Sequence, residues 1–375
     1  MTLKIGVLTG GGDCAGLNSA VQWVTQTASD PLLSHQRGYP LEVIGLREGW
    51  RGLVEVKPGD PESLARWTMP LDELTVRTWD RQGGTILGTS RTNPFNPKND
   101  QRERCLVNIR GLGLHALVAI GGEDTLSVAH KLHLLGQKVV GIPKTIDRDL
   151  GATDYTLGYD TALNVIIEEV DRLRTTAGSH SRLFVVEVMG RHAGWLALEG
   201  GEAAGAHVIL IPEYEFEVDR VAELLKRRRQ AGVRYDIVVV SEGAKIKGQG
   251  ERYISNQEDS FGHKTLGGMG EFLARSLEAA TGYEARHVVL SHIQRGGHPS
   301  ARDRLMGRHF GIAAVDLILK EDFGRMVSLR DGRITSVPLE EALKNLFLVD
   351  VNELYDPVRY NGRRSTVLPW SVRSE

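Results

Sequence analysis

The sequence has few cysteines, and this shortage excludes two classes of protein. Cys14 and Cys105 are the only two cysteines among 375 residues, which is too few for a disulfide-stabilised secreted scaffold. Cys14 lies in a glycine-rich stretch that lacks the cysteine and histidine spacing of a zinc site. We therefore expect a protein of a reducing compartment, the cytoplasm, without structural zinc.

Long apolar runs and an excess of charge are also missing. No apolar segment is long enough to cross a bilayer, and the N-terminal residues run into a strand-like pattern instead of a signal sequence. Lys and Arg (46) nearly balance Asp and Glu (48), and no basic block marks a surface for nucleic acid or anionic membranes. We expect a soluble protein whose partner is a small molecule, not a nucleic acid or a membrane.

Apolar residues, in contrast, make up 41% of the chain, which is enough for two cores. Short β-branched runs typical of buried strands alternate with helical repeats along the whole sequence. This alternation predicts an α/β fold whose parallel sheets are covered by helices on both faces.

The predicted elements are spread over most of the chain. Strand patterns occupy residues 4–9, 43–46, 116–120, 139–142, 183–188, 208–211, 237–241 and 287–290. Helical repeats occupy residues 17–27, 126–135, 161–176 and 303–319. We further expect a mobile surface loop at 247–270, a solvated helix end at Arg227–Arg229 and a polar tail at 359–375.

Two glycine-rich loops have the composition of anion sites. Gly10–Gly16 joins a strand to a helix, an arrangement in which backbone N–H groups receive a phosphate. Its spacing is neither the Walker nor the dinucleotide fingerprint, and a tight turn without a ligand fits equally well. Gly83–Arg91 ends in Arg91, whose guanidinium suits a phosphate oxygen; a solvated arginine that ends a turn is the alternative.

A third loop, Gly121–Thr125, places two glycines and two acids at the start of a helix. The glycines let the backbone approach a ligand, and we expect Asp124 or Thr125 to cap the helix. Glu123 and Asp124 offer the hard oxygen ligands that Mg²⁺ takes beside phosphates. Capping alone needs one acid, so the loop favours a binding site.

The loop Pro143–Asp149 is the most polar of these strand ends. It follows the apolar run 139–142 and carries an ammonium, a hydroxyl, a guanidinium and two carboxylates in close succession. Open α/β sheets bind their ligands at the carboxyl ends of the strands. The loop therefore predicts the centre of a site.

In order from Lys4 to Arg304, these motifs resemble the 6-phosphofructokinase family. They are Gly10–Gly16, Gly83–Arg91, Gly121–Thr125, Pro143–Asp149, Met189–Arg191 and His292–Gly297. One Gly-Gly-acid motif also fits NAD kinases and lipid kinases, but six motifs in order are specific. The resemblance implies a transferase acting on the 1-hydroxyl of fructose 6-phosphate, built as two doubly wound, Rossmann-like lobes with the active site in the cleft between them.

The resemblance also implies how the chain divides. Residues 1–158 with about 295–345 would form the larger phosphoryl-donor lobe, and residues 159–294 with about 346–375 the smaller sugar-phosphate lobe. The implied donor-binding residues are Gly11, Gly12, Arg91 and Gly122.

Matched residue by residue, Asp147 resembles the family's base, which takes the proton of the attacking sugar hydroxyl. A carboxylate near that hydroxyl suits phosphoryl transfer, which otherwise needs positioning and charge neutralisation. Thr145 matches a residue that contacts the sugar or the transferred phosphate. Glu123 and Asp149 match metal-side carboxylates, so the resemblance implies Mg²⁺ as the cofactor.

The sugar-phosphate pocket is implied further along the chain. Its residues are Met189, Gly190, Arg191, Glu242, His292 and Arg295, together with Thr145 and Asp147. Arg182 and Arg286 match arginines that reach the substrate from a neighbouring subunit. The protein would then be a homo-oligomer, either a dimer or a tetramer.

The phosphoryl donor depends on Asp124 and Lys144. Family members that use ATP carry glycine at both positions, whereas members that use pyrophosphate carry Asp and Lys, as this sequence does. Asp124 would place a carboxylate where the α-phosphate of ATP lies, so like charges and bulk disfavour the nucleotide. Lys144 would neutralise the pyrophosphate during transfer, so both belong to the catalytic set with Thr145 and Asp147.

Several positions depart from the family pattern. Arg148 replaces an asparagine, and we expect it to lower the pKa of its neighbours or to bind a further phosphate oxygen. Glu123 stands where many relatives have Asp. Val21, Thr25 and His207 do not match the residues that bind an allosteric nucleotide, so we expect no such regulation.

The leading hypothesis is a Mg²⁺-dependent phosphotransferase that converts pyrophosphate and fructose 6-phosphate reversibly into phosphate and fructose 1,6-bisphosphate. The ATP-dependent enzyme of the same fold is the first alternative, and a catalytically silent sugar-phosphate sensor is the second. A nicotinamide dehydrogenase is disfavoured because no Gly-x-Gly-x-x-Gly fingerprint follows the first strand.

Overall fold

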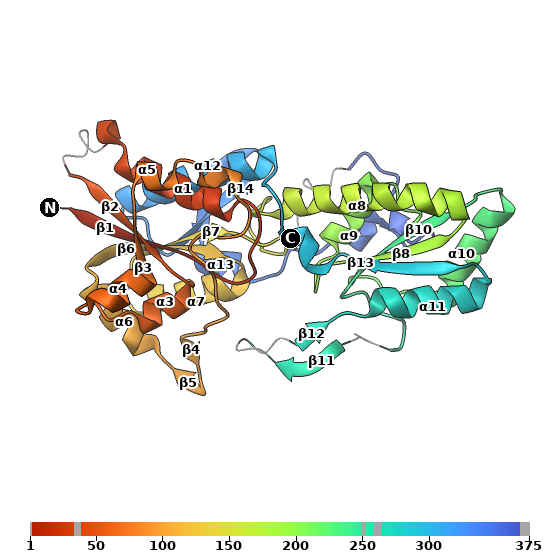
Figure 1. Ribbon diagram of the computed structural model, residues 1–375, viewed down its shortest axis with the longest axis horizontal. Coiled ribbons are helices and arrows are strands. Elements are labelled where there is room, and N and C mark those ends of the chain that lie inside the picture. Colours follow the sequence, from red (N-terminus) through yellow and green to blue (C-terminus); the bar gives the residue numbers. More distant parts are fainter. Residues whose placement is uncertain (1, 34–38, 250–252, 259–260, 262–263, 368–375) are drawn as a thin grey trace.

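Two large sheets, each covered by helices on both faces, form the two lobes of the molecule (Figure 1). The computed structural model describes residues 2–33, 39–249, 253–258, 261 and 264–367. Within these residues no helix combines the length and the apolar character needed to cross a membrane.

The larger lobe contains a seven-stranded sheet with the order β15-β14-β7-β6-β1-β2-β3. Its strands are β1 (Leu3–Thr9), β2 (Leu41–Leu46), β3 (Thr68–Leu71), β6 (Leu114–Gly121), β7 (Val139–Pro143), β14 (Arg325–Arg330) and β15 (Arg333–Pro338). The five inner strands pair in parallel, whereas β3 and β15 pair antiparallel with their neighbours. The predicted parallel sheet is therefore confirmed for the inner strands, whereas the two edge strands run antiparallel.

Helices pack on both faces of this sheet (Figure 1). On one face lie α1 (Leu17–Ser29) and α12 (Ala301–Leu319), which pack against each other. On the other face lie α3 (Trp50–Glu55), α6 (Arg102–Gly111) and α7 (Glu123–Leu134). The strands between them are almost fully buried, which explains why β1, β6 and β7 read as continuous apolar runs.

The smaller lobe contains a wholly parallel four-stranded sheet with the order β13-β8-β10-β9. Its strands are β8 (Leu183–Val188), β9 (Val208–Leu210), β10 (Asp236–Ser241) and β13 (Ala285–Val289). The helices α8 (Tyr159–His180) and α9 (Trp195–Ala203) pack against it. Helix α11 (Met269–Thr281) packs on β8 and β13, and α10 (Val218–Gln230) packs against α11.

Short elements complete the described chain. They are α4 (Pro61–Trp67), α5 (Glu73–Val76), η1 (Trp79–Arg81), β4 (Phe95–Asn96), β5 (Asn99–Asp100), β11 (Tyr253–Glu258), β12 (Lys264–Leu266), η2 (Ser291–Arg295), α13 (Leu339–Ala342), α14 (Val351–Leu354), β16 (Tyr355–Asp356) and β17 (Asn361–Gly362).

Three local predictions need correction. Within the predicted loop 247–270, β11 and β12 pair antiparallel, while residues 250–252, 259–260 and 262–263 lie outside the described residues. Arg228 and Arg229 are not merely solvated, because Nε of Arg228 donates to the buried Asp236 at 2.7 Å and Nε of Arg229 lies 3.6 Å from it. Of the predicted tail, β17 pairs with β16, and residues 368–375 lie outside the described residues.

The buried carboxylate of Asp303 on α12 ties the two lobes together. It accepts hydrogen bonds from the Tyr155 hydroxyl (2.8 Å), the Gly158 amide (2.7 Å) and the Thr161 amide (3.0 Å). These donors surround the first turn of α8, where the chain enters the smaller lobe. The junction is thereby fixed beside the loop that follows β7.

Candidate active site

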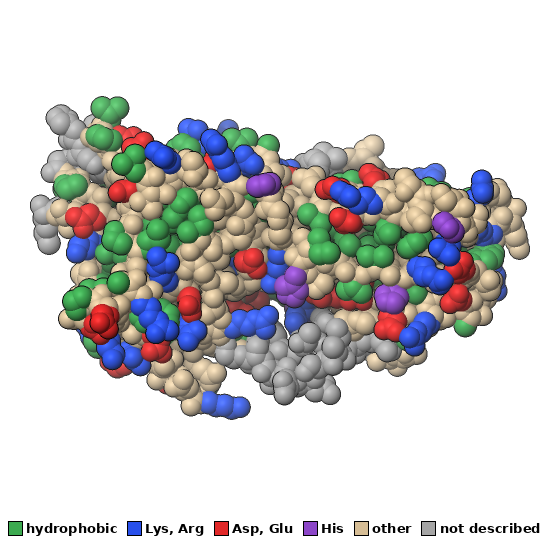
Figure 2. Space-filling model, in the orientation of Figure 1, with side chains coloured by type: hydrophobic (Ala, Val, Ile, Leu, Met, Phe, Trp, Pro, Cys, Tyr) green, Lys and Arg blue, Asp and Glu red, His purple; other side chains and the backbone are tan. Residues whose placement is uncertain are grey.

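A cavity of about 200 Å³ lies at the carboxyl ends of β1, β6 and β7, and residues of the segment after β8 and of η2 complete its lining. The predicted site residues that line it are Gly11, Gly12, Gly122, Glu123, Asp124, Lys144, Thr145, Asp147, Asp149, Arg191 and Arg295. Figure 2 shows charged and histidine side chains gathered on the surface where the two lobes meet. Residues from both lobes therefore share one site.

Three loops of the larger lobe meet here because β1, β6 and β7 are parallel neighbours. Backbone hydrogen bonds join them, from the Gly10 amide to the Ile120 carbonyl (2.9 Å) and from the Lys144 amide to the Gly121 carbonyl (3.0 Å). The hydroxyl of Thr89 donates to the Gly11 carbonyl at 2.7 Å, which attaches the second glycine-rich segment to the first.

Two predictions about these loops differ from the structure. Helix α7 begins at Glu123 with Gly122 as its N-cap, so Asp124 and Thr125 lie in the first turn and neither caps the helix. Arg91 is exposed and does not line the cavity, although only one residue separates it from Thr89 in the chain.

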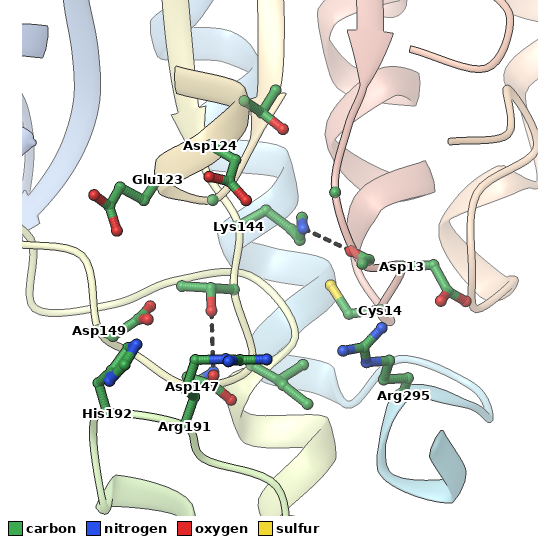
Figure 3. Close-up of a pocket in the computed structure, with 16 residues that line it drawn as sticks. Asp13, Cys14, Glu123, Asp124, Lys144, Asp147, Asp149, Arg191, His192 and Arg295 are labelled. Carbon is green, nitrogen blue, oxygen red and sulfur yellow. Dashed lines mark hydrogen bonds between the residues drawn. The ribbon is translucent and has the colours of Figure 1, made fainter. Parts of the chain in front are cut away.

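Lys144 is the buried cation of the cavity, with 4% of its surface exposed. Its Nζ donates to the Gly12 carbonyl at 2.6 Å, so the ammonium lies against the first glycine loop (Figure 3). Burial lowers the pKa of Lys144, and the nearby Arg295 guanidinium acts in the same direction. An anion bound at this loop would stabilise the charged forms of both Lys144 and Arg295.

Asp147 has the electrostatics of a proton acceptor. Burial and the neighbouring carboxylates of Asp149 and Glu242 raise the pKa of Asp147 to about 7, against the opposing influence of Arg295. The Asp147 amide donates to Oγ1 of Thr145 at 3.1 Å, which fixes the loop (Figure 3). A general base is most effective when its pKa lies near the working pH.

The carboxylates suit a magnesium ion that also contacts phosphates. Glu123 and Asp124 line the cavity from the first turn of α7, and Asp149 lines it from the β7 loop. Among the described residues, no group of three or more His, Cys, Asp and Glu side chains could hold a metal by itself. Mg²⁺ usually takes one or two carboxylates and completes its shell with water and phosphate oxygens, so these residues fit it.

The residues predicted for the sugar-phosphate pocket in the smaller lobe follow β8, β10 and β13. Met189 and Gly190 are buried directly after β8, and a Cβ on Gly190, whose φ is +129°, would lie 2.8 Å from the Ala193 carbonyl. Glu242 follows β10, and burial raises its pKa while the Arg191 guanidinium opposes this. His292 is exposed on η2. Of these residues and Arg191, only Arg191 lines the cavity itself.

Arg182 and Arg286 lie away from the cavity of their own chain. They stand at the amino ends of β8 and β13, opposite the ends that face the site, and both pair with Glu284. A single chain therefore does not bring these two arginines to the site residues.

A model of the phosphofructokinase family matches residues 4–318. The chain belongs to this family. A pyrophosphate–fructose 6-phosphate 1-phosphotransferase of Streptomyces coelicolor is 48% identical over 358 residues, covering 95% of this chain and 98% of the relative. An ATP-dependent 6-phosphofructokinase of the same organism is 43% identical and covers 92% of this chain and 96% of the relative.

A solved structure of a pyrophosphate-dependent phosphofructokinase from Marinobacter aquaeolei shares the fold. Its TM-score is 0.78 at 23% identity, covering 96% of this chain and 89% of that chain. The expected architecture of two α/β lobes with a site between them is confirmed for this phosphofructokinase.

Four cavity residues of this phosphofructokinase had no predicted role: Asp13, Cys14, Ile146 and His192. All four lie inside or directly beside the motifs, but the direction in which a loop side chain points cannot be read from spacing. Burial raises the pKa of the Cys14 thiol to about 12, and Sγ donates to the Leu157 carbonyl at 3.4 Å. Cys14 is therefore a packing residue rather than a nucleophile.

The expectation for Arg148 is wrong. Its side chain does not line the cavity but is buried on the other side of the loop, where Nη1 lies 2.6 Å from Oε1 of Glu199. Arg148 has a left-handed backbone with φ of +53°, and its side chain packs against Trp195 and Glu199 instead of entering the cavity with Asp147 and Asp149.

Proposed function

We propose that this phosphofructokinase transfers a phosphoryl group from pyrophosphate to the 1-hydroxyl of fructose 6-phosphate, reversibly and with Mg²⁺. The observation that carries the proposal is the position of Asp124 and Lys144, which line one cavity beside the glycine loop. The relatives from Streptomyces coelicolor and Dictyoglomus thermophilum that are named for this reaction support it, at 48% and 46% identity.

In the proposed mechanism, pyrophosphate lies against Gly11, Gly12 and Gly122, and Arg91 is a further proposed donor-binding residue. The ammonium of Lys144 and the guanidinium of Arg295 stabilise the charge that develops on the transferred group. Bound Mg²⁺, held by Glu123 and Asp149 and by phosphate oxygens, would supply further charge neutralisation.

Asp147 is the proposed base, and it accepts the proton of the sugar 1-hydroxyl as the new bond to phosphorus forms. Thr145 positions the loop and contacts the sugar or the transferred phosphate. The sugar phosphate is proposed to contact Met189, Gly190, Arg191, Glu242, His292 and Arg295. The chain is accordingly proposed to divide into a donor lobe (1–158 with about 295–345) and a sugar-phosphate lobe (159–294 with about 346–375).

We further propose a homo-oligomer in which Arg182 and Arg286 complete a neighbouring subunit's site. Their distance from their own cavity, along the full length of β8 and β13, supports this arrangement. Both cysteines are free and buried, which agrees with a cytoplasmic location.

The donor assignment is tested by initial rates with fructose 6-phosphate and Mg²⁺, comparing pyrophosphate with ATP. The proposal predicts turnover with pyrophosphate and at least about tenfold less with ATP, because Asp124 opposes the α-phosphate. Turnover with ATP alone would overturn it in favour of the second candidate, an ATP-dependent enzyme, which the 43% identity to such a relative favours.

A silent sugar-phosphate sensor is the remaining alternative. A pure binding protein has no use for a carboxylate whose pKa is raised to about 7 beside a buried lysine. Calorimetry that detects fructose 6-phosphate binding, together with no turnover for either donor, would favour the sensor.

A further inference from the structure

Arg148 lies between the proposed base and the metal-side carboxylate, yet its side chain leaves the cavity. Asp147 and Asp149 both line the cavity, whereas the side chain of Arg148 is 3% exposed and paired with Glu199. The pair is itself largely buried, because the Glu199 side chain is only 15% exposed. A buried guanidinium that keeps its charge is held tightly to its partner.

Three aromatic rings enclose the Arg148 guanidinium. Its Cζ lies 4.6 Å from the ring centroid of Trp195 and 5.4 Å from those of Tyr159 and Phe347. Trp195 and Phe347 also stack on each other, with centroids 4.8 Å apart. Each ring offers a favourable cation–π contact, and together with Glu199 they leave the guanidinium one orientation.

The enclosing groups belong to elements on the smaller-lobe side of the loop. Tyr159 opens α8, Trp195 and Glu199 lie on α9, and Phe347 precedes α14. Further bonds reinforce the contact, since the Phe347 amide donates to the Asp149 carbonyl at 2.8 Å and Nε1 of Trp195 donates to the Phe347 carbonyl at 2.8 Å. The β7 loop is therefore attached to α9 through a side chain that points away from the substrate.

We propose that Arg148 is a positioning residue, which docks the β7 loop onto α8 and α9 and thereby fixes where Asp147 meets the sugar hydroxyl. Asp147 and Asp149 line the cavity and Arg148 between them does not, so the docked arginine would hold the two flanking aspartates toward the cavity. This inference rests on the proposed role of Asp147 as the base.

The test is Arg148→Ala, which empties the aromatic enclosure. A displaced base slows the chemical step without weakening substrate binding, so we expect kcat to fall about 10²-fold while KM for both substrates changes less than about threefold. Millimolar guanidinium should restore part of the lost kcat by occupying the vacated space beside Glu199, and equal concentrations of sodium chloride or urea should not.

Two further variants complete the experiment. Arg172→Ala removes an exposed arginine of α8 with the same charge, 66% exposed and paired with Glu168, and should leave kcat and its response to guanidinium unchanged. Arg148→Met fills the enclosure without a charge and takes the place of Arg148→Ala if that variant does not fold. Glu199→Gln should lower kcat in the same direction, and its combination with Arg148→Ala should be less than additive.

An unchanged kcat in Arg148→Ala would overturn the inference, and so would a raised KM for pyrophosphate at unchanged kcat. A third contrary result is a loss of kcat that guanidinium does not restore, accompanied by a lower melting temperature. Failure of the donor assignment is distinguishable, because the wild-type protein would then lack turnover with pyrophosphate. In that case the same variant ratios are measured with ATP.

Discussion

Asp147 is placed where its negative charge is unfavourable. Burial raises its pKa, and Asp149 and Glu242 add repulsion, whereas Arg295 offsets only part of this. The same environment that prepares the carboxyl to accept a proton therefore reduces the stability of the fold. Activity and stability should respond in opposite directions when this side chain is changed.

The variant Asp147→Asn should lower kcat by about 10²–10⁴-fold, the usual contribution of a general base. It should also stabilise the metal-free protein at pH 8. The folded-state pKa of about 7 lies above the ordinary 3.8, so the wild-type protein loses stability as pH rises between these values, by at most about 4 kcal/mol. Thermal unfolding of both proteins at pH 4 and pH 8 measures this, and an equal difference at both pH values would contradict it.

Donor choice is predicted to depend on two side chains. Replacing both by glycine (Asp124→Gly with Lys144→Gly) removes the carboxylate that opposes the α-phosphate and the ammonium bound to Gly12 at 2.6 Å. Turnover with pyrophosphate should fall about 10²-fold, and turnover with ATP should rise. Rates with each donor measure the change, and an unaltered donor ratio would show that other residues select the donor.

At the scale of elements, the site is built from strand ends that the sequence makes easy to recognise. The runs that became β1, β6 and β7 are largely apolar, and each ends at or beside a glycine or proline that begins a loop. This is why the cavity residues Gly12, Asp124 and Lys144 could be predicted. The parallel order of the three strands then brings the loops together.

What could not be predicted depends on contacts between distant residues. A left-handed arginine at position 148 has no signature in the sequence, and neither does its pairing with Glu199. Arg228 on α10 pairs with the buried Asp236, which begins β10. The run of arginines at the end of α10 gives no sign of this pairing in the sequence. The hairpin of β14 and β15 was missed although Asp331 and its neighbouring glycine, both with positive φ, form a typical two-residue turn.

The carboxyl end of β6 should tolerate no side chain at Gly121, because an added Cβ would lie 2.6 Å from Cγ2 of Thr125. The variant Gly121→Ala should therefore be destabilised by about 1–3 kcal/mol and lose turnover as α7 shifts. Gly59→Ala is the matched control, since no atom lies within 4 Å of the added Cβ. Melting temperatures and rates decide this, and equal effects of the two variants would show that the close contact does not matter.

At the scale of the whole molecule, two arginines predicted for the site do not reach it within a single chain. Arg182 and Arg286 are held by Glu284 at the far end of the smaller sheet. If a neighbouring subunit receives them, two inactive variants should complement each other.

Mixing Arg182→Ala subunits with Asp147→Asn subunits, followed by dissociation and reassembly, should restore activity. In a random mixture of dimers about half the molecules are hybrids, each with one intact site in two, so about a quarter of the wild-type activity is expected. Each variant reassembled alone is the control. If the mixture stays as inactive as its components, Arg182 does not act between subunits.

The most direct measurement of the central claim is phosphorus NMR of one sample that contains the protein, pyrophosphate, fructose 6-phosphate and Mg²⁺. We predict that pyrophosphate is consumed while orthophosphate and a new sugar 1-phosphate resonance appear in equal amounts, and that adding excess orthophosphate reverses the change. Orthophosphate formed in a 2:1 ratio to consumed pyrophosphate, without a new sugar phosphate, would mean hydrolysis and contradict the claim. Unchanged pyrophosphate would contradict it as well.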